Sequence, residues 1–117
     1  MERVDMTVYV VQKQMRFDQE KGELVPRFPS IFRAERWGKL SFILSPSAHP
    51  FNSDTVVGDI HEKMRKFSDD DFLLLVGNPC LIGMVTAIAA HYNDGRVKFL
   101  QWSGQRGDYT EIVSKIF

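Results

Sequence analysis

The feature that most constrains the fold is an apolar run at residues 72–76 that shows no alternation of apolar and polar side chains. A strand of this kind is normally buried on both faces, which favours a central position in a partly parallel sheet. The run ends at Gly77, and a helical pattern begins directly after it. Asn78 can cap that helix, and Pro79 suits its first position, where the missing N–H costs nothing. The sequence therefore predicts a central strand that leads straight into a helix.

The remaining elements follow from hydrophobic periodicity and from turn residues. Further strands are predicted at residues 7–11, 40–44, 96–102 and 109–116. An amphipathic helix is predicted from the stripe Val57, Ile60, Met64 and Phe67, and a second helix from residue 79 to residue 90. The order is β-β-α-β-α-β-β, and two crossovers of helical length imply parallel neighbours. We expect an α/β fold with a mixed, partly parallel sheet of about five strands and two helices.

The length of 117 residues predicts one domain, spanning 1–117. Between about residues 13 and 39 the periodicity disappears, and Gly22, Pro26 and Pro29 interrupt the chain. We expect a long irregular loop there. A loop of this length inside a small domain is usually either functional or disordered, and its aromatic side chains argue against full disorder.

The composition narrows the classes of partner and compartment. Fifteen basic and fifteen acidic residues cancel, so no global field points to nucleic acid or to an anionic membrane. A single cysteine, Cys80, rules out an internal disulfide and favours a reducing compartment. The first residues include Glu2 and Asp5 and lack the apolar core of a signal peptide, and no apolar run approaches the ~20 residues of a membrane span. We expect a cytoplasmic protein without a membrane partner.

The strand-to-helix junction is the first candidate site. Amides of the first helical turn would face the carboxyl end of a central strand, where open α/β sheets bind ligands and where the helix dipole favours an anion. The candidate anion-binding residues are Gly77, Asn78, Cys80 and Leu81. The junction has one glycine and no Lys-Ser/Thr pair, so it matches neither the dinucleotide fingerprint nor the phosphate-binding loop. The alternative is a tight turn with an Asn cap, and both interpretations stay open at this point.

No complete catalytic or metal-binding constellation is present in the sequence. Cys80 stands early in a helix but has no base nearby in sequence, and we expect a buried structural thiol. His49, His61 and His91 show no ligand spacing, and the acidic run at 69–71 lacks the spaced ligands of a calcium loop. We therefore expect no metal and no cofactor, and an enzyme is not favoured.

The segment at residues 24–39 is the second candidate site, because it mixes basic and aromatic side chains. Its four basic residues stand against a single acidic one. The candidate partner-binding residues are Arg27, Phe28, Phe32, Arg33, Arg36 and Trp37. They suit a protein interface or single-stranded nucleic acid, or the rings simply cover the sheet face that two helices leave bare. Global neutrality makes nucleic acid the weakest of the three, because phosphate binding draws on accumulated positive charge.

From about residue 34 onward, and at residues 7–12, the chain resembles small proteins of tailed bacteriophages, particularly short-tailed ones. The residues that carry the resemblance are those at 7–12, 38–40, 69–79, 82–83 and 95–102, with Gln105, Arg106 and Tyr109. The family pattern carries Asp where Asn78 stands and an acidic residue where Ser103 stands. Any chemistry that depends on those carboxylates is therefore absent from this member. The resemblance implies a viral origin and a place in the host cytoplasm.

Two functional hypotheses follow. The first is a non-enzymatic phage accessory protein, of the host-takeover or counter-defence type, that binds a host or phage macromolecule through the basic and aromatic segment. The alternative is a nucleotide- or phosphate-binding protein, or a small enzyme, that uses the helix N-terminus after Gly77.

The strand at 96–102 places bulky apolar groups on both faces, and two helices are few to cover both sides of the sheet. We therefore expect a homodimer that buries the face carrying Leu100 and Trp102. The competing expectation is that the segment around Phe28, Phe32 and Trp37 covers that face and leaves a monomer.

Overall fold

The apolar run at residues 72–76 enters the centre of a five-stranded sheet in the computed structural model of the chain, which describes residues 6–117. The strands are β1 (Thr7–Gln12), β2 (Met15–Asp18), β3 (Glu23–Pro26), β4 (Lys39–Leu44), β5 (Phe72–Leu74), β6 (Arg96–Ser103) and β7 (Asp108–Lys115). The helices are the 3₁₀ helices η1 (Pro29–Arg36) and η2 (Pro50–Asn52) and the α-helices α1 (Ser53–Met64) and α2 (Pro79–Tyr92). The predicted α/β fold with a mixed sheet is confirmed.

The sequence analysis expects neither a signal peptide nor a membrane-spanning helix, and the described residues bear only on the second expectation. Glu2 and Asp5, which argue against a signal peptide, lie outside the described residues. Within residues 6–117, none of the helices has the length and apolar character needed to cross a bilayer.

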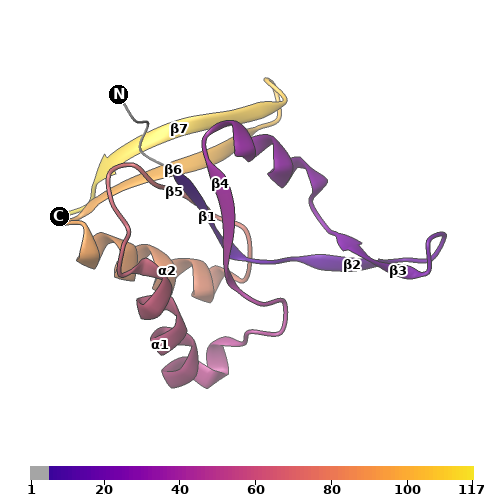
Figure 1. Ribbon diagram of the computed structural model, residues 1–117, viewed down its shortest axis with the longest axis horizontal. Helices are drawn as coiled ribbons and strands as arrows, with labels where there is room; N and C mark the ends of the chain where they lie inside the picture. The colour runs from indigo at the N-terminus through magenta and orange to yellow at the C-terminus, as the bar shows by residue number, and fades with distance from the viewer. Residues whose placement is uncertain (1–5) are drawn as a thin grey trace.

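The strands follow the order β4-β1-β5-β6-β7 across the sheet (Figure 1). The first four are parallel, and β7 runs antiparallel to β6. The expectation that each helical crossover joins neighbouring strands is correct for β5 and β6. It is wrong for β4 and β5, because β1 lies between them. β1 takes this inner position since Val8, Val10 and Val11 make it apolar on both faces, whereas β4 carries Lys39 and Ser41.

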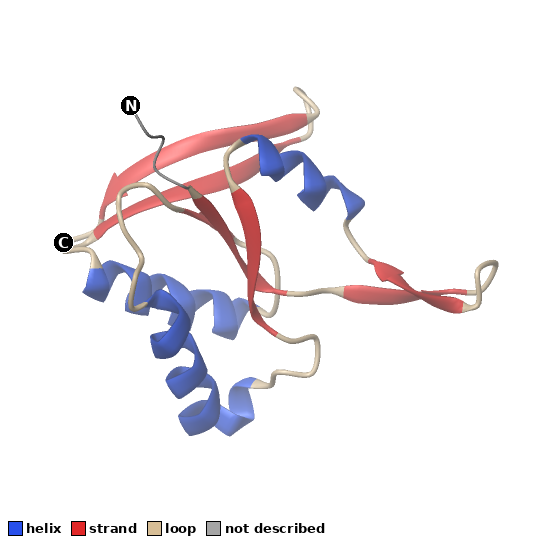
Figure 2. Ribbon diagram, in the orientation of Figure 1, coloured by secondary structure: helices blue, strands red, loops and turns tan. Residues whose placement is uncertain are grey.

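Both α-helices cover one face of the sheet, and η1 lies on the other (Figure 2). On the helix side, Val11, Leu73 and Val97 of the strands pack against α1 and α2. The helix residues of this core are Val56, Ile60, Met64, Leu81, Val85, Ala89 and Ala90. The core of the opposite face consists of Val8, Val10, Phe72, Leu74, Leu100 and Tyr109 with Ile31 and Ala34 of η1.

This two-sided arrangement follows from the direction of the crossovers. The chain moves from β1 outward to β4, then back past β1 to β5, and on to β6. Parallel crossovers are right-handed in nearly all proteins, so connections that travel in opposite directions lie on opposite faces of the sheet. The β1–β4 connection therefore carries η1 to the face that α1 and α2 leave bare.

The segment at 13–39, expected as an irregular loop, contains regular structure. β2 and β3 form an antiparallel hairpin that projects from the body of the domain (Figure 1), and η1 follows it. The Asp18 carboxylate accepts hydrogen bonds from the amides of Glu20 and Lys21, at 2.9 and 3.2 Å, and Gly22 closes the turn at φ +66°. The four-residue strands are too short to produce a periodic signal in the sequence, which explains the difference.

The apolar stripe of α1 differs from the predicted one at a single position. Val56, rather than Val57, is buried with Ile60 and Met64, since these three positions recur at exact four-residue steps on one side of the helix. Phe67 is buried as predicted, but it lies beyond the end of the helix.

Asp71 is a buried carboxylate immediately before β5, with 6% of its surface exposed. Its Oδ1 accepts a hydrogen bond from the amide of Thr7 at 3.2 Å. Its Oδ2 accepts from the amide and the hydroxyl of Ser68, at 3.0 and 3.3 Å. Asp71 thereby joins the beginnings of β1 and β5. Burial raises the pKa of its carboxyl above the ordinary value, although these donors act in the opposite direction.

Replacing Asp71 tests this junction. Asp71→Ala leaves the amides of Thr7 and Ser68 without acceptors, so we expect the free energy of unfolding to fall by about 1–3 kcal/mol. Because the folded-state pKa of Asp71 is raised, the native protein takes up this proton at a higher pH than the unfolded chain does. The stability that Asp71 contributes therefore rises as the pH falls through the folded pKa toward 3.8. Urea unfolding of the wild type and of Asp71→Ala between pH 7 and pH 4 measures the difference between their free energies of unfolding. A difference that shrinks as the pH falls contradicts a raised pKa of Asp71.

Candidate functional site

The junction between β5 and α2 is a tight turn built around Gly77. This residue has φ +140°, and a Cβ placed on it would lie 2.6 Å from the Cβ of Gln12. Asn78 caps α2, since its Oδ1 accepts hydrogen bonds from the amides of Cys80 at 2.8 Å and Leu81 at 3.4 Å. The capped turn, one of the two interpretations of this junction, is what the structure contains.

Gln12 at the end of β1 fills the position beside this turn. Its side chain is buried, with 3% of its surface exposed. Oε1 accepts from the amide of Asn78 at 3.0 Å and from the side-chain amide of Gln14 at 3.2 Å. Nε2 donates to the carbonyls of Ser45 and Ala48, each at 3.1 Å. One amide side chain therefore joins β1, the start of α2 and the loop between β4 and α1.

These contacts bear directly on the candidate anion site. The structure brings Gly77, Asn78, Cys80 and Leu81 together in one turn, as expected. The amides of Asn78, Cys80 and Leu81 are already hydrogen-bonded within the chain, to Gln12 and to the Asn78 cap. The expectation of a buried thiol is wrong, because Cys80 is exposed and Leu81 takes the core position one residue later.

The basic and aromatic segment divides into residues that hold η1 in place and residues that line a groove. The guanidinium of Arg33 donates to the carbonyl of Gly107 at 2.9 Å, and Arg36 pairs with Asp108. The indole of Trp37 donates to the Glu111 carboxylate at 2.8 Å. Arg33, Arg36 and Trp37 therefore bind the chain's own β7 and the turn before it.

Two aromatic contacts complete the attachment of η1. The ring of Trp37 meets that of Tyr109 edge-on at 6.2 Å, and the Tyr109 hydroxyl donates to the carbonyl of Ser30 at 3.3 Å. The Tyr109 amide, and after it the Arg36 guanidinium, hold the pKa of Asp108 below its ordinary value. The expectation that the rings of this segment cover the bare sheet face holds for Trp37 and is wrong for Phe28 and Phe32, which remain exposed, because Ile31 and Ala34 fill the core beneath η1.

A groove of about 750 Å³ lies at the carboxyl end of β5, on the side where η1 begins. We call it the β5 groove. It is lined mainly by apolar and aromatic side chains, and its lining includes Arg27, Phe28, Leu74, Gly77, Trp102 and Tyr109. The carboxyl end of a central strand is the usual ligand position of an open α/β sheet. Arg27 and Phe28, two of the predicted partner-binding residues, therefore belong to this groove together with Gly77.

The β5 groove exists because neighbouring strands differ in length. β5 ends at Leu74, opposite Leu100 of β6, whereas β6 continues to Ser103. Among the described residues, no strand pairs with the β5 side of β6 beyond Leu100. The site thus combines an apolar wall with an open strand edge, which is the arrangement that accepts an extended peptide.

The sequence analysis assigns no site role to Gln12 or Gln101, and it places Trp102 on a dimer face instead of in a groove. Gln12 is a polar residue directly after an apolar run, and such a position indicates a side chain that acts at the end of a strand. Gln101 and Trp102 belong to a long strand, β6, whose parallel neighbour β5 is short. This difference in length predicts that the end of β6 extends beyond β5.

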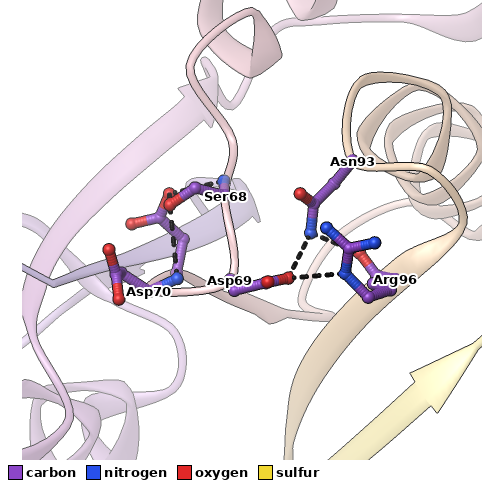
Figure 3. A network of polar contacts seen from close by, with 6 residues as sticks. Ser68, Asp69, Asp70, Asn93 and Arg96 are labelled. Atoms are coloured by element: carbon purple, nitrogen blue, oxygen red, sulfur yellow. Dashed lines mark hydrogen bonds and ion pairs between the residues drawn. The ribbon is translucent and has the colours of Figure 1, made fainter.

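The acidic run at 69–71 is a structural turn (Figure 3). The Asp69 carboxylate accepts hydrogen bonds from Asn93 Nδ2 at 2.8 Å and from Arg96 Nε at 3.0 Å. The amide of Asp70 donates to the Ser68 hydroxyl at 3.2 Å. The Asn93 amide, followed by the Arg96 guanidinium, lowers the pKa of Asp69. Within residues 6–117, no group of three or more His, Cys, Asp or Glu side chains is placed to hold a metal ion.

Two glycine substitutions test the packing at the β5–α2 turn. Gly77→Ala forces a Cβ against Gln12 at a backbone conformation that L-residues rarely adopt, and we expect a loss of about 1–3 kcal/mol in the free energy of unfolding. Gly83→Ala is the matched control, because it lies within α2 with open space around it and should gain about 0.5–1 kcal/mol. Chemical denaturation measures both, and equal effects at the two positions contradict the role given to Gly77.

Comparison with known proteins supports the phage origin. A family model described as phage Pam3 gp32-like protein matches residues 6–116. The match agrees with the resemblance to phage proteins found in the sequence, and the description of the family names no activity. No curated protein and no solved structure matches the chain. Because the matched region spans nearly all of its length, the chain belongs to the phage Pam3 gp32-like protein family.

Proposed function

We propose that this phage protein is a non-catalytic binding protein that holds an extended segment of a protein partner, from the host or the phage, in the β5 groove. The observation that carries the proposal is the groove itself, an apolar and aromatic hollow of about 750 Å³ bordered by the open edge of β6. Pockets of this size with a few polar groups are typical binding sites. A role in host takeover or counter-defence, in the host cytoplasm, is consistent with such binding.

The groove also defines the chemistry of the segment. Pairing with the edge of β6 directs alternate side chains of an added strand into the groove, and these must be apolar to suit Leu74, Trp102 and Tyr109. Arg27 stands over the ring of Phe28, 5.6 Å from its centroid, and no carboxylate of the described residues forms an ion pair with it. An acidic residue in the partner segment complements this guanidinium.

This proposal changes the binding surface that the sequence predicts. Arg27 and Phe28 of the basic and aromatic segment are retained, whereas Arg33, Arg36 and Trp37 are occupied within the chain. Two of the segment's basic side chains are therefore unavailable to phosphates, which weakens the argument for nucleic acid. The hydrogen-bonded amides after Gly77 likewise weaken the argument for a nucleotide or phosphate ligand.

A displayed library of random linear peptides, selected on the immobilised full chain, tests the proposal. We expect enriched peptides with apolar residues at alternate positions and an acidic residue. Their affinity should fall by about tenfold or more in Phe28→Ala and in Trp102→Ala, because aromatic anchors dominate such interfaces. Fluorescence anisotropy with a synthetic copy of the best peptide measures the dissociation constants.

Phe51→Ala is the matched control, since Phe51 is 89% exposed and does not line the groove. The affinity of this variant for the peptide should stay within about twofold of the wild-type affinity. Thermal melting checks that each variant is folded. Peptides that bind the two groove variants as tightly as the wild type, or a selection without enrichment, contradict the proposal.

A further inference from the structure

The outer strand β7 leaves one long edge of the sheet open. It is eight residues long and pairs only with β6 among the described residues. Figure 1 shows β7 at the rim of the molecule, with η1 and the helices to one side of it. An edge of this kind presents a row of backbone N–H and C=O groups that can pair with another strand.

The edge lacks two of the usual protections against pairing, a proline and a β-bulge. β7 contains neither proline nor glycine, and it is regularly paired with β6 from Asp108 to Lys115. Val113, in the second half of the strand, is 73% exposed, and Ile112 is also exposed. Glu111 and Lys115 are the charged side chains beside Val113 on the same face of the strand. Their signs are opposite, and they stand at equal distances in sequence from Val113.

We propose that two copies of this chain associate through β7, paired antiparallel about a two-fold axis at Val113. In this register Val113 lies opposite Val113 of the second copy, and Glu111 lies opposite Lys115 on both sides of the axis. The exposed valines are buried against each other, and both charges find an opposite charge. A two-fold axis requires self-complementary surfaces of this kind. The two sheets then form one continuous sheet.

The neighbouring register of the same symmetry sets Glu111 opposite Val113, so the glutamate faces an apolar side chain instead of a cation. The register centred on Val113 avoids this cost.

This association differs from the dimer expected from the sequence. Leu100 is buried beneath η1 and Tyr109, whereas Trp102 on the same face is 41% exposed and belongs to the β5 groove. Ile112 lines the β5 groove, but Glu111, Val113 and Lys115, which carry the association, do not. The inference therefore stands independently of the proposed function.

Charge reversal at the two edge positions tests the register. Glu111→Lys places like charges opposite each other twice in a dimer, and Lys115→Glu does the same with the opposite sign. We expect the dissociation constant of each variant dimer to be about tenfold or more above that of the wild-type dimer. An equimolar mixture of the two variants should recover the dimer, because every pair in the mixed dimer is of opposite sign. Sedimentation velocity at micromolar concentrations measures the species.

Three further variants keep the test decisive. Glu111→Lys loses the hydrogen bond from Trp37, so Val113→Lys provides a disruption at the axis that leaves this bond intact. The pair Glu62→Lys and Lys63→Glu, on the exposed side of α1, is the matched control and should leave the dimer unchanged. A wild-type chain that is monomeric at these concentrations overturns the inference. So does a mixture of the edge variants that stays monomeric, or edge variants that dimerise as the wild type does.

Discussion

The amide side chain of Gln12 holds together the part of the fold on which the site depends. It lies where β1 ends and bonds to the start of α2 and to the loop that leaves β4. All of its hydrogen-bonding partners are main-chain groups except Gln14, so the contact constrains backbone rather than side chains. A buried amide of this kind is costly unless every partner is present. Gly77 allows the approach, since any Cβ there would overlap with Gln12.

This constraint explains why the carboxyl end of the sheet holds an apolar groove instead of an anion site. In many α/β proteins the loops after adjacent strands diverge to opposite faces, and the space between them binds a ligand. Here β1 and β5 are those strands, because one leads to η1 and the other to α2. The Gln12 side chain occupies the space between them. The open volume is displaced toward β6, where the early end of β5 exposes a strand edge and aromatic walls.

The elements with strong local signals could be predicted from the sequence. The unbroken apolar run gave the central strand, and Asn78 with Pro79 marked the start of α2, because capping and proline geometry act within a few residues. The strand order was not predicted, since the inner position of β1 depends on its burial relative to β4, and two strands far apart in the chain are compared only when they pack in one sheet. The roles of Arg33, Arg36 and Trp37 also depend on β7, which lies more than seventy residues away in sequence. A basic and aromatic segment looks the same in a sequence whether its partner is another protein or its own sheet.

The two surfaces proposed for binding are compatible because they use different parts of β6 and β7. The groove is formed beyond Leu100, on the β5 side of β6, whereas the association uses the opposite edge of β7. η1 connects them, since Ser30 and Ile31 line the groove and Trp37 binds Glu111 in β7. A dimer joined through β7 carries two β5 grooves on one continuous sheet, so a partner with two matching segments gains from effective concentration without any new contact. Weak single-site binding in the groove is then enough for firm attachment to a partner that is itself an oligomer.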